Sequence, residues 1–293
     1  MTANQPWTVA RLLDWTAKYL AEKGSESPRL DTEVLLAHSL ACKRIDLYTR
    51  HDEVVTEDSR LRFKALIRQR VEGCPVAYLV GRKEFYSVEF EVSRAVLIPR
   101  PDTETVVEEC LKLAKPMAEP TVLDIGTGSG CLAVAVAKYC KQARVTAVDI
   151  SAEALQVAAR NAAKHGVAER IRFARGDLFA PLADGEAFDF ILSNPPYIPR
   201  DDIAGLAPGV RDFEPHMALD GGRDGLEMLG RLVTGAAARL KPSGYLIVEI
   251  GAPQEKPARA RMEAVPGFEL AKTVHDSAGH PRVLRARWRP ASR

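Results

Sequence analysis

The sequence predicts an α/β protein in which a mostly parallel sheet of seven strands follows a small helical bundle and a β-hairpin. Over the last two thirds of the chain, short β-rich runs alternate with helical patterns, which is typical of a parallel sheet with helices on both faces. Before residue 75 the apolar residues show only helical spacing. The length of 293 residues agrees with a division into two domains.

Residues 1–74 are predicted to form the helical domain. Its first helix is indicated by positions that recur at the spacing of one helix face, Val9, Leu12, Leu13, Thr16 and Leu20. A second helix is expected to begin at Pro28, since proline is favourable in the first turn of a helix. A third is expected near Leu61. We expect Trp7 and Trp15 to pack inside this bundle.

Residues 75–98 are predicted to form a hairpin that links the two domains. The apolar run Val76–Val80 is interpreted as one strand and Gly81-Arg82 as the turn. The alternating residues of Phe85–Val92 are interpreted as the other strand. A helix is expected to begin just after Pro101, within the larger domain, residues 99–293.

The larger domain contains seven candidate strands, and helical patterns such as Glu153–His165 lie between most of them. The last two candidates are separated by little more than Asp276–Pro281, which is too short for a helical crossover, so they are expected to pair antiparallel. The candidates are Thr121–Ile125, Arg144–Ile150, Arg170–Arg175, Phe188–Ser193, Gly244–Ile250, Phe268–Val274 and Arg282–Trp288.

The charge of the chain is balanced in both parts. Residues 1–98 carry 15 Lys and Arg against 14 Asp and Glu, and residues 99–293 carry 26 against 25. A non-specific nucleic-acid binder usually presents a basic stripe, because neutralising phosphates supplies most of its affinity. The balance therefore disfavours stable nucleic-acid binding without excluding it, since a local patch can lie within a balanced total.

Composition also bears on metals, secretion and membranes. The N-terminus lacks a basic segment followed by an apolar one, so no secretion signal is expected. The longest apolar-rich run, Cys131–Ala137, is far shorter than the roughly 20 residues of a membrane span. We expect a cytoplasmic protein with no membrane partner. No metal site is expected either, because no C-x-x-C pair or histidine at ligand spacing accompanies the five cysteines, Cys42, Cys74, Cys110, Cys131 and Cys140.

A glycine-rich turn joins the first strand of the larger domain to a helical segment. It consists of Gly126, Thr127, Gly128, Ser129 and Gly130. Such a turn lets the backbone approach a ligand at the carboxyl edge of a sheet, although glycines are also used in turns for positive φ alone. The spacing is not the dinucleotide G-x-G-x-x-G, and no Lys-Ser/Thr pair follows. A neutral loop of this kind suits S-adenosylmethionine, which has no phosphate.

Acidic residues lie at or just after the ends of the next two strands. Asp149 ends the second strand, where a carboxylate accepts both ribose hydroxyls in other doubly wound folds. The alternative is an acid at a helix N-terminus, where Ser151 is the better cap. Asp177 and Leu178 follow the third strand at the expected place of adenine: Asp177 would accept from its amino group and Leu178 would pack on its face. Asp177 as a loop or helix cap is the alternative.

The tetrapeptide Asn194-Pro195-Pro196-Tyr197 follows the fourth strand, at the edge where open α/β folds bind ligands. Methyl transfer from a sulfonium mainly requires that the nucleophile be positioned. An amide or aromatic amine nitrogen is a poor nucleophile, because its lone pair is delocalised. The Asn194 side-chain oxygen and the Pro195 carbonyl would accept its two N–H bonds and direct the lone pair toward the methyl carbon.

The other residues of the tetrapeptide suit this reaction. Pro195 and Pro196 fix φ and offer no competing donor. Tyr197 offers a flat face to a planar substrate. The alternative is a simple turn, since Asn and Pro are common turn formers. The position after the fourth strand, downstream of the glycine turn and Asp149, favours a catalytic centre.

With the glycine turn, this tetrapeptide resembles the methyltransferases of DNA adenine N6, of some RNA guanine N2 and of protein glutamine N5. Further segments narrow the resemblance to the peptide chain release factor glutamine methyltransferases (HemK-like), over essentially the whole chain. These segments are Ile98–Glu104, Phe213–Pro215, Ala218–Gly222 with Asp224–Leu226, and Val248–Gly251.

The resemblance implies a Rossmann-like methyltransferase domain, S-adenosylmethionine as methyl donor, and methylation of the glutamine in the Gly-Gly-Gln loop of bacterial class I release factors. The helical domain would recognise this substrate. Gly126–Gly130, Asp149, Leu178 and Asn194 would contact the cofactor. Asn194–Tyr197 would hold the glutamine amide.

Two alternatives remain open. A nucleic-acid amino-methyltransferase acting on adenine N6 or guanine N2 would use the same four residues, but it would need a reading domain with a basic face, which residues 1–98 do not indicate. A non-catalytic module that binds the ribosome or a translation factor would keep only the fold. The complete glycine turn, Asp149 and the intact tetrapeptide argue against it.

Overall fold

The computed structural model describes residues 6–290, which form two compact units. The first unit is Met1–Gly81 together with Ala207–Phe213, and the second is Arg82–Leu206 together with Glu214–Arg293. The chain therefore passes from one unit to the other three times. The domain boundaries predicted at residues 74 and 98 stay a prediction. In the structure, Ala207–Phe213 also belongs to the first unit.

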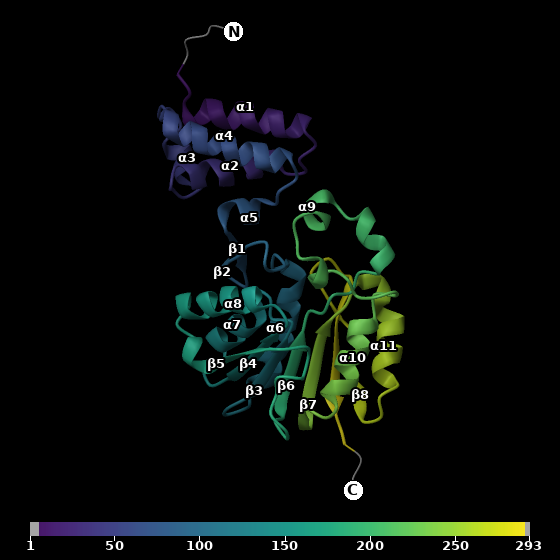
Figure 1. Cartoon of the computed structure of the whole chain (residues 1–293). Helices are drawn as coiled ribbons and strands as arrows, with labels where there is room; N and C mark the ends of the chain where they lie inside the picture. The colour runs from purple at the N-terminus through teal and green to yellow at the C-terminus, as the bar shows by residue number, and fades with distance from the viewer. Residues whose placement is uncertain (1–5, 291–293) are drawn as a thin grey trace. The chain divides into compact units, whose positions relative to one another are not determined.

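The first unit is a helical bundle, as predicted (Figure 1). Its apolar core contains Val9, Leu13, Leu36, Leu47 and Phe63, which are all almost fully buried. Trp7 is partly buried against this core, but Trp15 is 49% exposed, so the expectation that Trp15 packs inside the bundle is wrong. The helices are α1 (Val9–Glu22), α2 (Pro28–Ser39), α3 (Asp46–Thr49), α4 (Glu57–Val71), α5 (Val76–Val80) and α9 (Pro208–Arg211).

The predicted first strand of the hairpin is wrong, because Val76–Val80 forms the short helix α5. Pro75 precedes this helix and Gly81 ends it in the left-handed conformation at φ 71°. A short apolar run does not distinguish a strand from a buried helical turn. The hairpin itself consists of β1 (Arg82–Phe85) and β2 (Val88–Glu91), one segment further along the chain.

The turn of this hairpin lacks the usual sequence signature, and this explains the wrong prediction of the first strand. Tyr86 and Ser87 connect the two strands, and both have positive φ, 49° and 55°. A two-residue hairpin turn with positive φ at both positions usually carries Asn-Gly or a similar pair. Tyr-Ser lacks that signature, so the sequence did not mark the turn.

The second unit is an α/β fold with the predicted mostly parallel sheet (Figure 1). Within the described residues the strand order is β5-β4-β3-β6-β7-β10-β8, and β9 also pairs with β10. All pairs from β5 to β7 are parallel, whereas β10 is antiparallel to its neighbours, as expected for the end of the chain. The strands are β3 (Thr121–Ile125), β4 (Arg144–Asp149), β5 (Ile171–Arg175), β6 (Phe188–Ser193), β7 (Leu240–Glu249), β8 (Phe268–Leu270), β9 (Val274–His275) and β10 (Pro281–Trp288).

The predicted strand Phe268–Val274 is interrupted. The structure divides it into β8 and β9, which both pair with β10. The predicted seven-stranded domain is otherwise confirmed, with an additional break in its last antiparallel edge.

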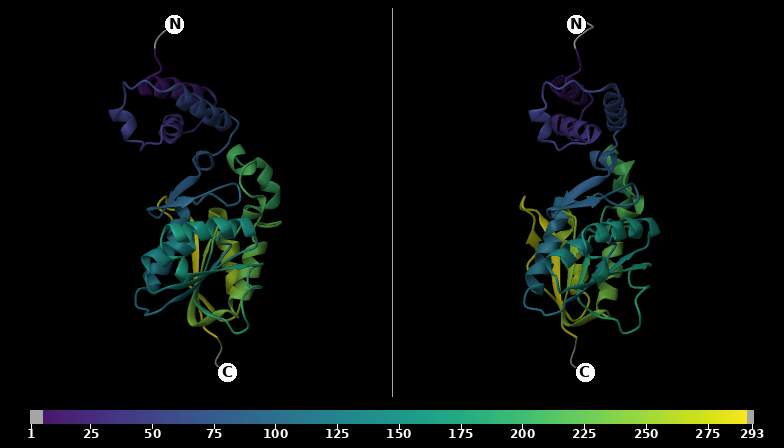
Figure 2. Two further views of the ribbon diagram at one scale, coloured as in Figure 1. Left: turned by 60° about the vertical axis from the view of Figure 1, so that its left-hand side comes forward. Right: turned by 90° about the vertical axis from the view of Figure 1, so that its left-hand side faces the viewer.

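Helices cover both faces of the sheet, and alternate strand residues serve the two faces. On β3, Val122 packs in the apolar cluster that also contains residues of α6 (Glu104–Ala114), α7 (Cys131–Tyr139) and α8 (Ala152–Lys164). The next residue, Leu123, packs in the cluster with α10 (Glu227–Ala236) and α11 (Glu255–Glu263). Figure 2 gives two further views of these layers.

The strand order reverses beside β3. From β3 the chain runs outward to β4 and β5, then returns to β6 on the other side of β3. Ile125 and Ser193, the last residues of β3 and β6, are register partners, so the segments that follow them leave the sheet at the same level. Such a switch point is where doubly wound sheets bind ligands.

Short 3-10 turns follow several of these elements. They are η1 (Pro101–Thr103), η2 (Ala168–Arg170), η3 (Arg200–Gly205), η4 (His216–Ala218) and η5 (Ala252–Gln254). Among the described residues, none of the helices has the length and apolar character needed to cross a bilayer.

Candidate active site

A pocket lies at the carboxyl edge of the sheet, beside the switch point. Residues that follow four neighbouring strands line it, together with Ala95–Leu97 and residues of the segment around Met217. Eight of the residues singled out from the sequence meet here, namely Gly126, Gly128, Asp149, Asp177, Leu178, Asn194, Pro195 and Pro196. Thr127, Ser129, Gly130 and Tyr197 are not part of its lining, and their assigned contacts stay predictions.

The glycines of the turn after β3 meet two different requirements. Gly126 and Gly128 have φ of 73° and 55°, and a Cβ on either would meet no atom closer than 4.0 Å. Glycine is needed at these two positions for the left-handed backbone, which other residues adopt only with strain. At Gly130 a Cβ would lie 3.0 Å from the Cβ of Ala158, so this glycine allows α7 and α8 to approach closely.

Thr127 and Ser129, the two residues between the glycines of the turn, are buried. Thr127 Oγ1 donates to Asp124 Oδ2 (2.6 Å), which also accepts from the backbone N–H of Ala133 (3.2 Å). Burial raises the pKa of Asp124 to about 7, although both hydrogen bonds favour the carboxylate. Asp124 thus ties the turn to the first turn of α7.

Asp149 ends β4 and lines the pocket. Its Oδ2 accepts from the backbone N–H of Gly128 (2.9 Å) and its Oδ1 from that of Ser151 (2.9 Å). The cap of α8 is Ser151, whose Oγ accepts from the N–H of Ala154 (3.1 Å), so Asp149 is not the cap. Burial raises the pKa of Asp149. Each carboxylate oxygen keeps a further lone pair, which suits a ligand with two neighbouring hydroxyls.

Asp177 and Leu178 lie together at the pocket after β5. Asp177 Oδ2 pairs with Arg231 (2.5 Å), on the surface of α10. Leu178 adopts a positive φ of 50° and packs against the apolar cluster of α10 and α11. A positive φ is unusual for leucine, and here it accompanies a place in the pocket wall.

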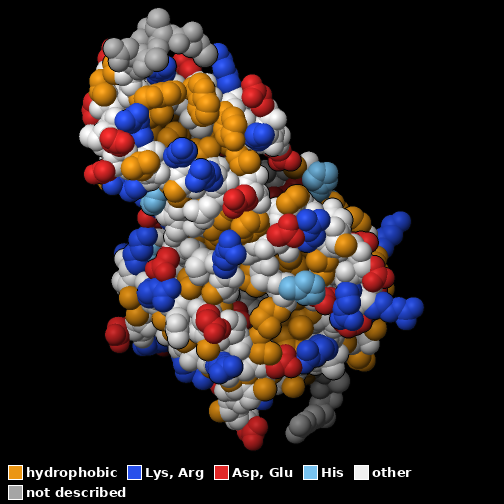
Figure 3. Space-filling model, turned by 45° about the horizontal axis from the view of Figure 1, so that its top comes forward, with side chains coloured by type: hydrophobic (Ala, Val, Ile, Leu, Met, Phe, Trp, Pro, Cys, Tyr) orange, Lys and Arg blue, Asp and Glu red, His pale blue; other side chains and the backbone are white. Residues whose placement is uncertain are grey.

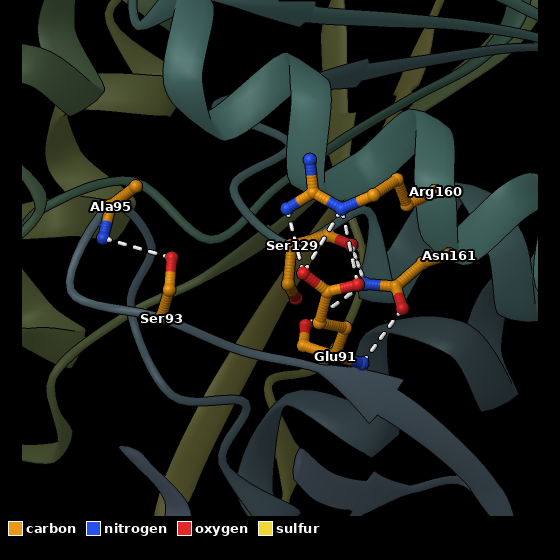
Figure 4. A network of polar contacts seen from close by, with 6 residues as sticks. All are labelled: Glu91, Ser93, Ala95, Ser129, Arg160 and Asn161. Carbon is orange, nitrogen blue, oxygen red and sulfur yellow. Dashed lines mark hydrogen bonds and ion pairs between the residues drawn. The ribbon is translucent and has the colours of Figure 1, made fainter. Parts of the chain in front are cut away.

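Asn161 connects the hairpin to the glycine turn (Figure 4). This fully buried side chain accepts from the N–H of Glu91 (2.7 Å) and donates to the carbonyls of Glu91 (3.0 Å) and Ser129 (2.9 Å). Beside it, the exposed Arg160 pairs with the Glu91 carboxylate (2.7 Å). The strand β2 that leads to the pocket residues Ala95–Leu97 is therefore fastened to the turn after β3.

Asn194 is held by a residue from a distant segment. Its Nδ2 donates to Thr103 Oγ1 (3.0 Å), and Thr103 Oγ1 donates to Glu249 Oε2 (2.6 Å). Thr103 ends the η1 turn and Glu249 ends β7. Because the nitrogen of the Asn194 carboxamide faces Thr103, the oxygen of the same carboxamide points away from Thr103. Asn194 also lines the pocket.

Glu249 is an ionisable residue buried among several charged groups. It is 1% exposed, and burial raises its pKa to about 7. The Thr103 hydrogen bond, Arg282 and Arg100 act in the opposite direction, and the neighbouring Asp102 raises the pKa further.

Tyr197 is fixed through its backbone. Its carbonyl accepts from Gln254 Nε2 (2.8 Å), which also donates to the carbonyl of Gly225 (3.2 Å). A Cβ on Gly221 would lie 2.8 Å from Tyr197 Cα, and one on Gly225 would collide with the Tyr197 carbonyl. Burial raises the pKa of the Tyr197 hydroxyl to about 12. The tetrapeptide is thus clamped between glycines of the segment 221–225 and Gln254.

Sequence reasoning did not identify Asn161, Thr103, Glu249 or Gln254 as parts of this site. Thr103 and Glu249 lie within the segments Ile98–Glu104 and Val248–Gly251, which supported the resemblance but were given no role. Asn161 lay in a predicted helix with no distinguishing motif. The contacts described above for these four residues join positions 29 to 146 residues apart, which no local pattern reveals.

The doubly wound fold, the glycine turn and the tetrapeptide at the switch point define a methyltransferase. Two family models match the chain: one described as the PrmC N-terminal domain covers residues 11–81, and one described as the methyltransferase small domain covers residues 104–205.

Relatives named release factor glutamine methyltransferase match nearly the whole chain. The protein of Rhodopirellula baltica is 46% identical over 97% of this chain and 97% of its own length, and that of Geobacter sulfurreducens is 44% identical over 96% and 97%. The chain belongs to the family of release factor glutamine methyltransferases.

Solved structures of lower identity share the fold. A ribosomal protein L11 methylase from Lactobacillus delbrueckii subsp. bulgaricus has a TM-score of 0.50 and 22% identity, covering 68% of this chain and 84% of that one. A methyltransferase from Pyrococcus furiosus has a TM-score of 0.51 and 19% identity, covering 70% and 91%. These similarities concern the fold alone.

Proposed function

We propose that this protein transfers a methyl group from S-adenosylmethionine to the side-chain amide nitrogen, N5, of the glutamine in the Gly-Gly-Gln motif of class I peptide chain release factors, and so modulates translation termination in the cytoplasm. The observation that carries the proposal is the Asn194 carboxamide at the switch-point pocket, with its nitrogen engaged by Thr103. Its oxygen is then the hydrogen-bond acceptor available to a substrate amide. The family membership supports glutamine as the acceptor.

The residues of the pocket fit the proposed cofactor. The carboxylate of Asp149 suits the two ribose hydroxyls, and the bare backbone at Gly126 and Gly128 suits close approach of the amino-acid end. Leu178 offers an apolar surface for adenine, and Asp177 an acceptor for its amino group. When bound, S-adenosylmethionine supplies an electrophilic methyl group on a sulfonium.

The tetrapeptide positions the nucleophile. The Asn194 side-chain oxygen and the Pro195 carbonyl would each accept one N–H of the glutamine amide, which directs the nitrogen lone pair at the methyl carbon. The nitrogen becomes much more acidic as it is methylated, so no strong base is required. The clamp of Gln254 on the Tyr197 carbonyl holds this loop in one conformation.

The first unit carries a groove suited to recognition of a protein substrate. It lies between α1 and α4, where Trp15 is stacked on Tyr19 with ring centroids 5.3 Å apart. Figure 3 shows hydrophobic side chains gathered on this part of the chain, with Lys and Arg around them. The basic residues in the groove lining, Arg60, Lys64 and Arg68, outnumber the single acid Glu57.

We propose that this groove docks a segment of the release factor that combines an apolar anchor with acidic neighbours. Aromatic side chains and arginine are enriched where binding energy concentrates at interfaces. Trp15→Ala should then raise KM for the release factor at least several-fold and leave KM for the cofactor unchanged. Ile45→Ala, a change at a residue of the same unit that is 66% exposed and outside the groove, serves as the matched control. Equal KM values for the two variants would contradict this docking site.

The transfer itself is tested with labelled cofactor. The protein is incubated separately with a release factor, with its Gln→Ala loop variant, with DNA and with RNA. We expect label on the unmodified release factor only. Label on DNA or RNA but not on the release factor would establish the nucleic-acid methyltransferase instead, and tight cofactor binding without any label would establish a binding module.

Asn194→Ala tests the positioning mechanism. The substitution should abolish transfer while cofactor binding persists in part, because Asp149 and the glycine turn remain. Cofactor binding is measured by calorimetry beside the transfer rate. Near-normal turnover of this variant would contradict the role of the carboxamide.

A further inference from the structure

We propose that Thr103 and Glu249 are positioning residues that lock the Asn194 carboxamide with its oxygen toward the substrate. The inference rests on the function proposed above and assigns a role to two segments, Ile98–Glu104 and Val248–Gly251. In this proposal neither Thr103 nor Glu249 contacts the substrate glutamine, and both act through Asn194.

The need for such a lock follows from the shape of a carboxamide. Its oxygen and its NH2 group are nearly equal in size but opposite in hydrogen bonding, one an acceptor and the other a double donor. Rotation of Asn194 by 180° about its last torsion would present NH2 to the substrate amide in place of the oxygen. Donor would then face donor, and the substrate nitrogen would not be oriented. Packing alone distinguishes these two rotamers poorly.

Thr103 distinguishes them, because its hydroxyl has a single proton. That proton is donated to Glu249 Oε2 over 2.6 Å, and an ionised carboxylate can only accept. The hydroxyl can therefore offer Asn194 only a lone pair, at 3.0 Å from Nδ2. In the flipped rotamer the Asn194 oxygen would face that lone pair without a proton between them.

Burial gives this preference its strength. Thr103 is 2% exposed and Glu249 is 1% exposed, so water does not compete for either group. A buried polar group left without its partner destabilises the conformation that contains it. Thr103 comes from the η1 turn, which leads directly into α6, and Glu249 comes from the end of β7, so both residues belong to elements other than the tetrapeptide loop.

The ionisation of Glu249 sets the direction of the relay. The groups that interact with it electrostatically are Arg282, Arg100, Asp102, Tyr197 and Cys131. Burial raises the pKa of Glu249 to about 7. When protonated, Glu249 can donate to Thr103, whose own proton is then free to turn toward Asn194 and stabilise the flipped rotamer. Activity should therefore fall as the pH drops through about 7.

Three variants test this role, with transfer to the release factor measured from pH 6 to 9. Thr103→Val removes the hydroxyl at nearly constant volume and should lower kcat by about 10-fold or more, with KM for the cofactor unchanged. Thr103→Ser should restore most of kcat. Glu249→Gln cannot ionise, so its activity should be reduced and lose the acid limb near pH 7. Thr146→Val, at a buried threonine of β4, is the matched control and should retain wild-type kcat.

The proposal is overturned if Thr103→Val keeps kcat within twofold of wild type, if Thr103→Ser is no better than Thr103→Val, or if Glu249→Gln keeps the acid limb. A second measurement does not depend on the substrate. In NMR spectra, the side-chain NH2 signal of Asn194, assigned by its loss in Asn194→Ala, should exchange slowly with solvent in wild type and Thr103→Ser and rapidly in Thr103→Val. Equal exchange in all three would also overturn the proposal, whereas failure of transfer by the wild type alone would overturn only the proposed substrate.

Discussion

Ser193 Oγ donates a hydrogen bond to the carbonyl of Ile125 over 2.8 Å and so joins the ends of β6 and β3. These two residues are also register partners in the parallel sheet. The glycine turn begins at the residue after Ile125, and the tetrapeptide at the residue after Ser193. At the switch point this hydrogen bond therefore adds to the strand pairing that holds together the starts of the two segments that we propose bind the cofactor and the substrate.

Ser193→Ala should weaken this junction. The lost hydrogen bond should lower the free energy of unfolding by about 1 kcal/mol, and cofactor affinity should fall because the glycine turn is less well held. Denaturant unfolding and calorimetric titration of the cofactor measure the two effects. An unchanged unfolding midpoint together with unchanged affinity would show that the hydroxyl does not contribute.

Asn161→Ala and Arg160→Ala form a matched pair on neighbouring positions of α8. Asn161 is fully buried and loses three hydrogen bonds, so this variant should be destabilised by about 2–4 kcal/mol. Arg160 loses only an exposed ion pair to Glu91, a change of less than about 1 kcal/mol. Chemical denaturation measures both. Similar values for the two would mean that the link from the hairpin to Ser129 carries no stability.

Gly225→Ala should disturb the tetrapeptide far more than Gly185→Ala. Both glycines have similar positive φ, 74° and 76°, so both variants suffer comparable backbone strain of about 1 kcal/mol. A Cβ at Gly185 meets nothing within 4 Å, whereas one at Gly225 collides with the Tyr197 carbonyl and Gln254 Nε2. We expect Gly185→Ala to keep its transfer rate and Gly225→Ala to lose most of it. If the two variants had equal transfer rates per folded molecule, the proposed clamp on the tetrapeptide would be excluded.

Asp124→Asn should change how stability depends on pH. Burial raises the pKa of Asp124 from 3.8 to about 7 in the folded chain, so between these values the folded state binds a proton that the unfolded state has released. This group's contribution to stability is therefore present at acidic pH and lost as pH rises toward 7.

Asparagine at position 124 does not titrate, and its side-chain oxygen can still accept from Thr127. The stability of Asp124→Asn relative to wild type should thus increase from pH 4 to pH 7 and level off above. Thermal unfolding without cofactor across this range measures the difference. A difference that is constant with pH would mean that Asp124 titrates near its ordinary value in the folded chain.

Local patterns in the sequence were enough to predict the α/β class, most strands of the sheet and the two segments at the switch point. Period-two and helical patterns of apolar residues indicate which residues face the core. In β3 and β6 these patterns were clear enough to predict that the glycine turn and Asn194 lie at one edge of the sheet. Ser151 was also recognised as the cap of α8, because capping depends on a few adjacent residues.

Features that depend on residues far apart in the chain emerge only when the elements are packed together. The apolar run Val76–Val80 suits either periodicity, and in the structure it forms a helix. Trp15 is exposed, and its helical spacing could not show whether another element covers it. Thr103 and Glu249, 146 positions apart, meet beneath Asn194 only when η1 and β7 are both in place. Local patterns encode which face of an element is buried, whereas hydrogen bonds between buried polar groups depend on which elements become neighbours.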